Sequence, residues 1–131
     1  MNNQLINNSH FHSKDVGRGI WHSWHSVAFS ATERSDITSL YHIILLYNKV
    51  IRCKTCAPHS NHYIDSTSED LYSVLKDTNI TDSEVIDYFN RWLYEYHRKA
   101  NEYAGKTSPP YDDVAEYYLN FEYCEDCAIK N

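Results

Sequence analysis

The chain has 131 residues, with 18 acidic and 12 basic side chains that give a formal net charge of −6. This length suits one domain, and the acidic balance excludes the strongly basic footprint of a nucleic-acid-binding protein. The longest apolar run, Ile43 to Tyr47, is far shorter than the roughly 20 residues of a membrane span, and the polar first 19 residues show no secretory signal.

The sequence pattern of the N-terminal third predicts a polar arm followed by two helices. Residues 1–16 are polar and predict a mobile arm. A helical pattern begins at Arg18, and a second apolar stripe runs from Ile37 to Ile51 with Ser35 as its expected N-cap. The first stripe consists of Trp21, Trp24, His25, Ala28 and Phe29.

The middle of the chain carries the signals of further helix starts. Pro58 suits the first turn of a helix that begins near Thr55 or Cys56. Residues 66–70 supply cap residues for a short helix that holds Leu71, Val74 and Leu75.

A long helix and a short last one complete the pattern. Residues 81–84 fit a capping box before an apolar stripe from Val85 to Tyr103, and Gly105 suits the C′ position after it. Asp112 and Asp113 open a final helix that reaches about Phe121.

The sequence therefore predicts an all-α fold, a four-helix bundle with a short fifth helix. The expected organisation is an arm at 1–16, one helical domain at 17–121 and a tail at 122–131. With only three glycines and three prolines, the composition disfavours a turn-rich all-β fold.

All four cysteines lie in two CxxC pairs, Cys53 with Cys56 and Cys124 with Cys127. Thiolates at this spacing can bind zinc, cycle as a redox disulfide or form a static disulfide. A zinc site could add His59 and His62 to the first pair, or could join the two pairs.

A redox role has its own physical basis. A helix that begins near Cys56 would lower the pKa of the Cys56 thiol through its N-terminal dipole. The second pair, Cys124 and Cys127, lies on the tail, where it could act as a carrier.

Aromatic and histidine residues on two of the predicted helices offer walls for a flavin. Trp21 and His25 share one helix face, and His97 and Asn101 share another. A flavin needs a slot for a flat ring and cations for its phosphates. Trp92 and Tyr96 are further ring candidates, and Arg18 and Lys106 are the candidate cations.

Each of these side chains also fits an ordinary structural role. Trp21 and Trp92 lie in apolar stripes and suit core packing. A lone His25 or His97 suits a hydrogen-bonded interfacial histidine, and Lys106 suits a helix-end cation.

The order and spacing of these residues resemble the Erv/ALR family of FAD-linked sulfhydryl oxidases. Residues 17–25, GRGIWHSWH, are similar to the family opening G-R-x-x-W-x-x-L-H, and Cys53-Lys54-Thr55-Cys56-Ala57 follows, with His59 and Tyr63 beyond. A later stretch is similar to the pattern F-x-x-W-L-x-x-x-H-N-x-V-N-x-x-x-G-K. Its matching residues are Phe89, Trp92, Leu93, His97, Asn101, Gly105 and Lys106. The resemblance covers roughly residues 17–118.

The chain departs from the family pattern at four of these positions. Arg98 replaces the usual Asn, Ala100 the usual Val, and Trp24 a common Leu. Tyr118 stands where the family often has Trp, and its flat ring could still stack.

The resemblance implies a homodimer of bundles, each with FAD at the bundle end. It implies that Cys53 is the interchange thiol, Cys56 the charge-transfer thiol beside the flavin, and Cys124-Cys127 a shuttle pair. The expected cofactor-binding residues are Arg18, Trp21, His25, Trp92, His97, Asn101, Lys106 and Tyr118.

The implied activity is disulfide formation in protein substrates. Electrons would pass from substrate thiols through Cys124-Cys127 and Cys53-Cys56 to FAD and then to O2, giving H2O2. Expected partners are thiol-containing proteins or a thioredoxin-like relay protein, without nucleic acid or a membrane span. The short chain favours a minimal virus-encoded type, in the host cytoplasm or virion, over a mitochondrial intermembrane-space enzyme. The competing hypothesis is a structural zinc-binding interaction module that uses the CxxC pairs.

Overall fold

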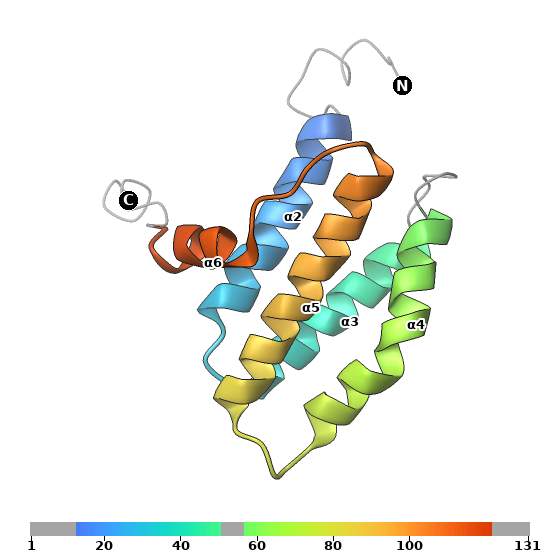
Figure 1. The fold of residues 1–131 in the computed structure, drawn as a ribbon. Helices are drawn as coiled ribbons and strands as arrows, with labels where there is room; N and C mark the ends of the chain where they lie inside the picture. Colours follow the sequence, from blue (N-terminus) through green and yellow to red (C-terminus); the bar gives the residue numbers. More distant parts are fainter. Residues whose placement is uncertain (1–12, 51–56, 122–131) are drawn as a thin grey trace, which may run out of the picture.

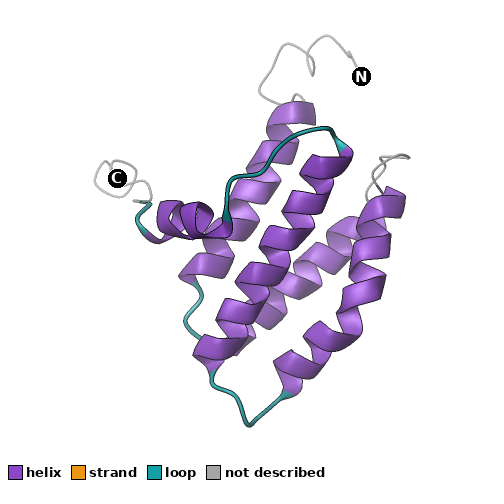
Figure 2. Cartoon of the chain, viewed as in Figure 1, coloured by secondary structure: helices purple, strands orange, loops and turns teal. Residues whose placement is uncertain are grey.

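The computed structural model describes residues 13–50 and 57–121, which form helices and no strand. These helices are α2 (Ser13–Ser30), α3 (Arg34–Val50), α4 (Ala57–Lys76), α5 (Asp82–Tyr103) and α6 (Tyr111–Leu119). The first four alternate in direction around a shared core, and the short α6 packs against α2 (Figure 1; Figure 2). The all-α prediction of a four-helix bundle with a short fifth helix is confirmed for this part of the chain.

The first two helices begin earlier than the sequence pattern indicated. α2 begins at Ser13 rather than Arg18, so four residues of the expected arm are helical. Only one of these four residues, Val16, is apolar, so they give no apolar period and the pattern missed them. α3 begins at Arg34, and the Asp36 carboxylate, not Ser35, accepts hydrogen bonds from the amides of Thr32 and Glu33. Residues 1–12 and the tail lie outside the described residues.

The expected short helix at residues 71–75 is wrong, because α4 runs unbroken from Ala57 to Lys76. The hydroxyls of Ser66 and Thr67 donate to the carbonyl of Tyr63, one turn earlier in the same helix. Side chains that could cap a helix start are therefore used inside the helix, a known alternative for Ser and Thr.

Both ends of α5 follow the predicted capping chemistry. Thr81 and Glu84 form a reciprocal capping box at its start. At its end Gly105 has φ +73°, and the amides of Gly105 and Lys106 donate to the carbonyls of Glu102 and Asn101 at 3.0 and 2.7 Å. This is a Schellman motif, and its left-handed C′ position favours glycine.

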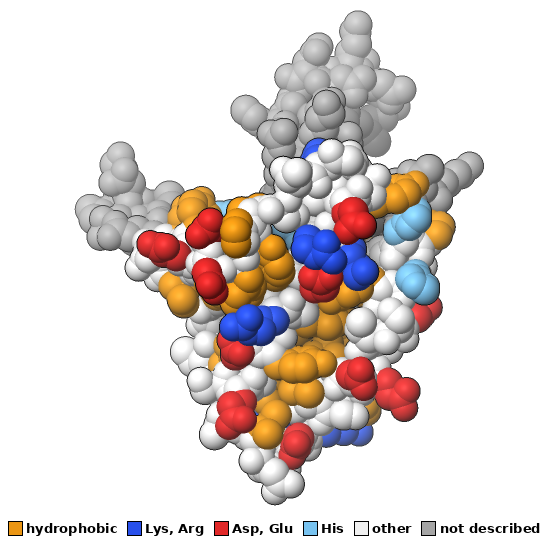
Figure 3. Space-filling view, in the orientation of Figure 1, with side chains coloured by type: hydrophobic (Ala, Val, Ile, Leu, Met, Phe, Trp, Pro, Cys, Tyr) orange, Lys and Arg blue, Asp and Glu red, His pale blue; other side chains and the backbone are white. Residues whose placement is uncertain are grey.

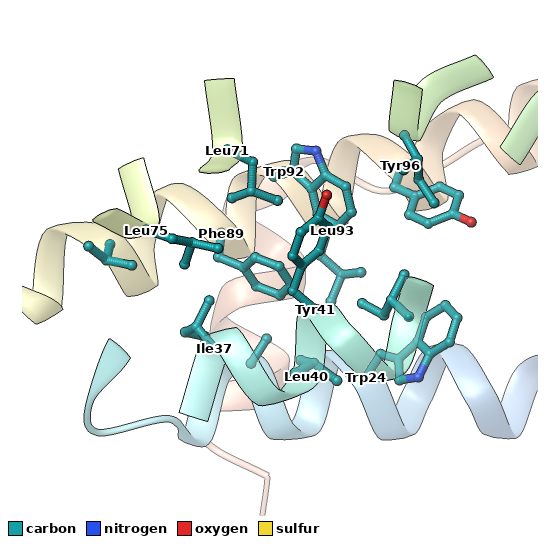
Figure 4. Close-up of a cluster of buried hydrophobic side chains, with 14 of the residues drawn as sticks. Trp24, Ile37, Leu40, Tyr41, Leu71, Leu75, Phe89, Trp92, Leu93 and Tyr96 are labelled. Carbon is teal, nitrogen blue, oxygen red and sulfur yellow. The ribbon is translucent and has the colours of Figure 1, made fainter. Parts of the chain in front are cut away.

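The core lies between α3, α4 and α5 and is closed by α2. Figure 4 shows the aromatic centre, in which Trp92 of α5 packs against Phe89 and Tyr41. The largest fully buried side chains are Phe89, Ile37, Ile44, Leu71, Leu93 and Val85. Such close packing of branched and aromatic side chains is the main source of stability in a helical bundle.

Arg34 closes the end of the bundle where α3 and α5 begin. Its guanidinium donates to the carbonyls of Leu75, Asp77 and Ile80 and, at 2.7 Å, to the Asp82 carboxylate. These bonds satisfy one carbonyl in the last turn of α4 and two in the loop that follows it. One side chain thus ties α3 to the loop between α4 and α5.

Candidate cofactor-binding site

A cavity of about 340 Å3 lies between the second half of α5 and α6, with one wall from α2. Its lining residues are His25, Tyr94, His97, Arg98, Asn101, Ser108, Pro109, Asp113, Val114, Tyr117 and Tyr118. Figure 3 shows hydrophobic side chains on this face of the molecule over α6 and the neighbouring part of α5, with charged groups beside them. The volume of the cavity falls within the usual range of ligand pockets, roughly 300–1,000 Å3.

A buried histidine, His25, and a half-buried one, His97, form the inner wall of the cavity. His25 Nε2 lies 3.0 Å from His97 Nδ1, so the two rings share one hydrogen bond. Burial lowers the pKa of His25 to about 3, helped by the neighbouring His97 and His22. Burial and nearby Lys106 lower the pKa of His97 to about 4. Both rings are therefore neutral at neutral pH, so each can offer one donor and one acceptor.

His25 carries an unsatisfied polar atom in this wall. The residue is only 2% exposed, and its Nδ1 has no hydrogen-bond partner. A buried polar atom without a partner costs about 1–3 kcal/mol. A ligand that placed a polar group against Nδ1 would remove that cost.

Flat rings extend the histidine pair on both sides. Trp21 stacks on His97 with ring centroids 4.2 Å apart and an interplanar angle of 0°. On the other side Tyr118 stacks on His25 at 5.3 Å and on Phe29 at 5.7 Å. The result is a row of parallel or nearly parallel rings, the surroundings that a flat heteroaromatic ligand needs.

Asn101 lies one helical turn beyond His97 and lines the same cavity. The two residues therefore share a face of α5, as the sequence predicted. The Asn101 side-chain amide donates to the Ser108 hydroxyl at 2.9 Å, which positions it at the edge of the cavity. Its side-chain carbonyl adds an acceptor at that edge.

Arg98 stands where the family pattern has Asn, and it is already paired. Its guanidinium forms ion pairs with Glu95 and, at 3.0 Å, with Glu102 on the same helix. The Arg98 hydrogen bond lowers the pKa of the Glu95 carboxyl. Arg98 therefore contributes to the cavity rim with its charge neutralised.

Several predicted site residues do not line the cavity. Trp21 is not among the lining residues, although its ring stacks on His97. Trp92 lies in the core, 6% exposed, with its indole N–H donating to the Thr67 hydroxyl at 2.8 Å. Lys106 is exposed beyond the end of α5 and is not among the lining residues. Arg18 is helical in α2, but its side chain lies outside the description, as do Cys53, Cys56, Cys124 and Cys127.

The sequence missed the side of the cavity that the 104–110 loop and α6 provide. Tyr94 donates its hydroxyl to the carbonyl of Pro109 at 2.6 Å, which brings the loop against α5. The loop and α6 add Ser108, Val114 and Tyr117 to the lining. His22 was also passed over, yet its Nδ1 lies 3.2 Å from the Tyr118 hydroxyl.

The two histidines of the zinc hypothesis, His59 and His62, do not line this cavity. His59 and His62 are exposed in the first turns of α4, and His59 packs on Tyr103. Within residues 13–50 and 57–121, no group of three or more His, Cys, Asp or Glu side chains is placed to hold a metal ion. The cysteines that this hypothesis needs are not in those ranges.

No family model, no curated protein and no solved structure matches this chain. Among the described helices, none has the length and apolar character to cross a membrane.

Proposed function

We propose that this chain is a FAD-dependent sulfhydryl oxidase that forms disulfide bonds in protein substrates and uses O2 as the final electron acceptor. One observation supports the proposal most. His25 of α2, His97 and Asn101 of α5 and Tyr118 of α6 are all expected cofactor-binding residues, and they line a single cavity. A chance match of short motifs has no physical reason to bring them together.

The residues of the cavity fit part of a flavin cofactor. The nearly parallel rings of His25 and Tyr118 suit a flat base, and the Asn101 side-chain carbonyl suits an amino group. The cavity is large enough for one ring system rather than for a whole dinucleotide. We therefore assign the cavity to one end of FAD, and we propose Arg18 and Lys106 as the cations that bind its phosphates. When bound, FAD supplies the two-electron acceptor that this chemistry requires.

The cysteines would supply the thiol chemistry. A substrate dithiol becomes a disulfide while the Cys124-Cys127 disulfide becomes a dithiol, and the same exchange then reduces Cys53-Cys56. Each exchange conserves two electrons and two protons. Cys53 would be attacked by the incoming thiolate, and Cys56 would be the thiol that passes electrons to the cofactor.

A homodimer is part of the proposal. Beyond its buried face, α3 carries Ile43, Leu46 and Val50 at exposures of 56%, 60% and 56%. These residues recur at helical spacing, so they form a second apolar face on one helix. We assign this face, called the outer α3 strip below, to contact with a second copy. The expected setting is still a virion or host cytoplasm.

The colour and activity of the purified full chain test the proposal. Bound FAD gives absorbance at about 450 nm, as any oxidised flavin does. With dithiothreitol as substrate, the protein should consume O2 and produce H2O2. Cys56→Ser should keep the colour and lose thiol oxidation. The double change Cys124→Ser with Cys127→Ser should spare dithiothreitol oxidation and slow a protein substrate.

The zinc module gives the opposite results. It predicts a colourless protein with stoichiometric zinc, no O2 consumption, and unfolding on chelation. Wild-type turnover in Cys56→Ser would also remove that residue from the proposed reaction.

A further inference from the structure

Three polar side chains from three helices meet inside the bundle, close to the candidate site but outside its cavity. Asn48 of α3, Ser60 of α4 and Tyr96 of α5 form this group, called the polar cluster below. The Tyr96 hydroxyl lies 2.9 Å from Asn48 Oδ1, and the Ser60 hydroxyl contacts both of these oxygens. The two hydroxyl protons make two of these three contacts hydrogen bonds, with Asn48 Oδ1 as an acceptor. Asn48 uses its amide N–H on the carbonyl of Ile44 at 2.9 Å.

Two members of the polar cluster are buried, so the loss of their hydrogen bonds would be destabilising. Asn48 is 7% exposed and Tyr96 is 5% exposed. Burial raises the pKa of Tyr96, which keeps its hydroxyl protonated and able to donate. Burial makes such hydrogen bonds costly to lose, because a buried polar group left without a partner is destabilising. The cluster therefore specifies how the three helices meet.

Its position along the chain is the informative part. Asn48 is two residues before the end of α3, and Ser60 lies in the first turn of α4. The residues between these helix ends, 51–56, contain Cys53 and Cys56. The cluster thus ties together both flanks of the CxxC pair and joins them to α5.

On α5 the cluster leads directly to the wall of the cavity. Tyr96 precedes His97, and its ring meets the edge of Trp21 with centroids 5.1 Å apart. Trp21 in turn stacks on His97, which bonds to His25. One continuous set of contacts therefore joins the flanks of the CxxC pair to the rings of the candidate site.

We propose that Tyr96 is a positioning residue of the oxidase. Its hydroxyl, held by Asn48 and Ser60, fixes the flanks of the Cys53-Cys56 pair relative to the cofactor site, so that the polar cluster sets the rate of flavin reduction and not the affinity for flavin. This inference rests on the proposed function. Transfer between a thiolate and a flavin depends steeply on orientation, and a misplacement of about 1 Å can cost about 100-fold in rate.

Tyr96→Phe tests the idea, because it removes the hydroxyl and keeps the ring that contacts Trp21. In the full-length protein loaded with FAD, we expect at least a fivefold slower reduction of flavin by dithiothreitol under anaerobic conditions. FAD affinity and reoxidation by O2 should stay within twofold of wild type. Ser60→Ala should reproduce this pattern.

Tyr63→Phe is the matched control. Tyr63 is equally buried, and its hydroxyl also links α4 to α5, donating to the carbonyl of Trp92 at 2.7 Å. It makes no hydrogen bond to the polar cluster. Its flavin should be reduced at the wild-type rate. Wild-type reduction in Tyr96→Phe, or an equal slowing in both variants, would overturn the inference.

A second measurement separates this inference from the proposed function. The full chain with Cys124→Ser and Cys127→Ser is equilibrated in glutathione buffers, and the oxidised fraction of Cys53-Cys56 is measured by alkylation. Adding Tyr96→Phe should shift the exchange equilibrium at least threefold, and adding Tyr63→Phe should not. A colourless wild type would refute the proposed oxidase function. The shift in the exchange equilibrium would then still test whether Tyr96 positions the Cys53-Cys56 pair. An unshifted equilibrium, or the absence of a disulfide between these cysteines, contradicts the positioning role.

Discussion

His25 and His97 hold two neutral rings where free histidines would be partly charged at mildly acidic pH. In their shared hydrogen bond one ring donates and the other accepts, and burial penalises a positive charge on either ring. The pair therefore couples the integrity of the site to pH.

The stability of the flavin-free protein should fall as the pH is lowered from 7.5 to 5.5. Because both pKa values are lowered in the folded state, to about 3 and about 4, the unfolded chain binds more protons in this range. Each histidine, titrating near 6.5 when unfolded, should cost about 1 kcal/mol over that interval. Urea unfolding followed by circular dichroism measures this loss.

His97→Gln is the control for this pH effect. Glutamine keeps a polar group near His25 and does not titrate, so the pH dependence should shrink by about half. The same loss of stability in wild type and His97→Gln would show that other groups cause it.

Some single-residue assignments follow from sequence and others need the fold. His97 and Asn101 could be paired because helix periodicity puts residues four apart on one face. Trp92 was expected at the flavin and lies in the core, since an apolar stripe does not say which of its members meet a neighbouring helix. Tyr117 and Ser108 depend on where α6 docks, which no local pattern encodes.

Helix ends were readable where side chains cap them in a regular way. The Thr81 capping box and the Gly105 C′ position were both predicted and are both present. The continuity of α4 was missed, because Ser and Thr residues that often start helices bond inside α4. Capping residues predict an end only when their side chains have no alternative partner.

The outer α3 strip is the element on which the proposed dimer depends. Leu46→Glu places a charge in its centre, so burial of the strip against a second copy would require burial of that charge. We expect the variant to sediment as a monomer at concentrations where the wild type is a dimer. Its helical content should be unchanged.

Tyr72→Glu provides the comparison for Leu46→Glu. It also replaces an exposed apolar side chain by a carboxylate, but on α4, where Tyr72 is 52% exposed. Its oligomeric state should match that of the wild type. A monomeric wild type, or a dimeric Leu46→Glu variant, would disprove the assigned contact.

For the whole molecule, FAD should act as a part of the fold. A ligand that binds only the folded state at 100 times its Kd adds about 2.7 kcal/mol. For a domain of this size that corresponds to a rise in Tm of about 10 °C. Thermal unfolding of the flavin-free protein with and without added FAD measures it.

Two comparisons locate the contact within the cofactor. Flavin mononucleotide lacks the adenosine half and should raise the Tm less than FAD does. Tyr118→Ser, which removes a ring that stacks on His25, should reduce the FAD effect. A Tm that does not respond to FAD would argue against the cofactor assignment.

The all-helical architecture was open to prediction as a whole because each long helix has a clear apolar stripe. The sequence also indicated which residues would matter, but not that their cavity would lie on the flank beside α6. That placement depends on the Tyr94 bond to Pro109 and on rings contributed by α6. Such contacts join distant residues and leave no local period.

The hydrogen bonds of Arg34 to Asp82 and to the loop after α4, called the Arg34 clamp here, stabilise the end of the bundle that lies away from the candidate site. Asp82, which Arg34 holds, is separated from His97 by 15 residues, or about 22 Å of helix. Changes at the clamp would alter how much of the chain is folded while the folded molecules keep the same reactivity. Adaptation to a warmer or cooler setting can therefore act at one end of the bundle without revising the chemistry at the other. Engineering for thermal tolerance has the same freedom.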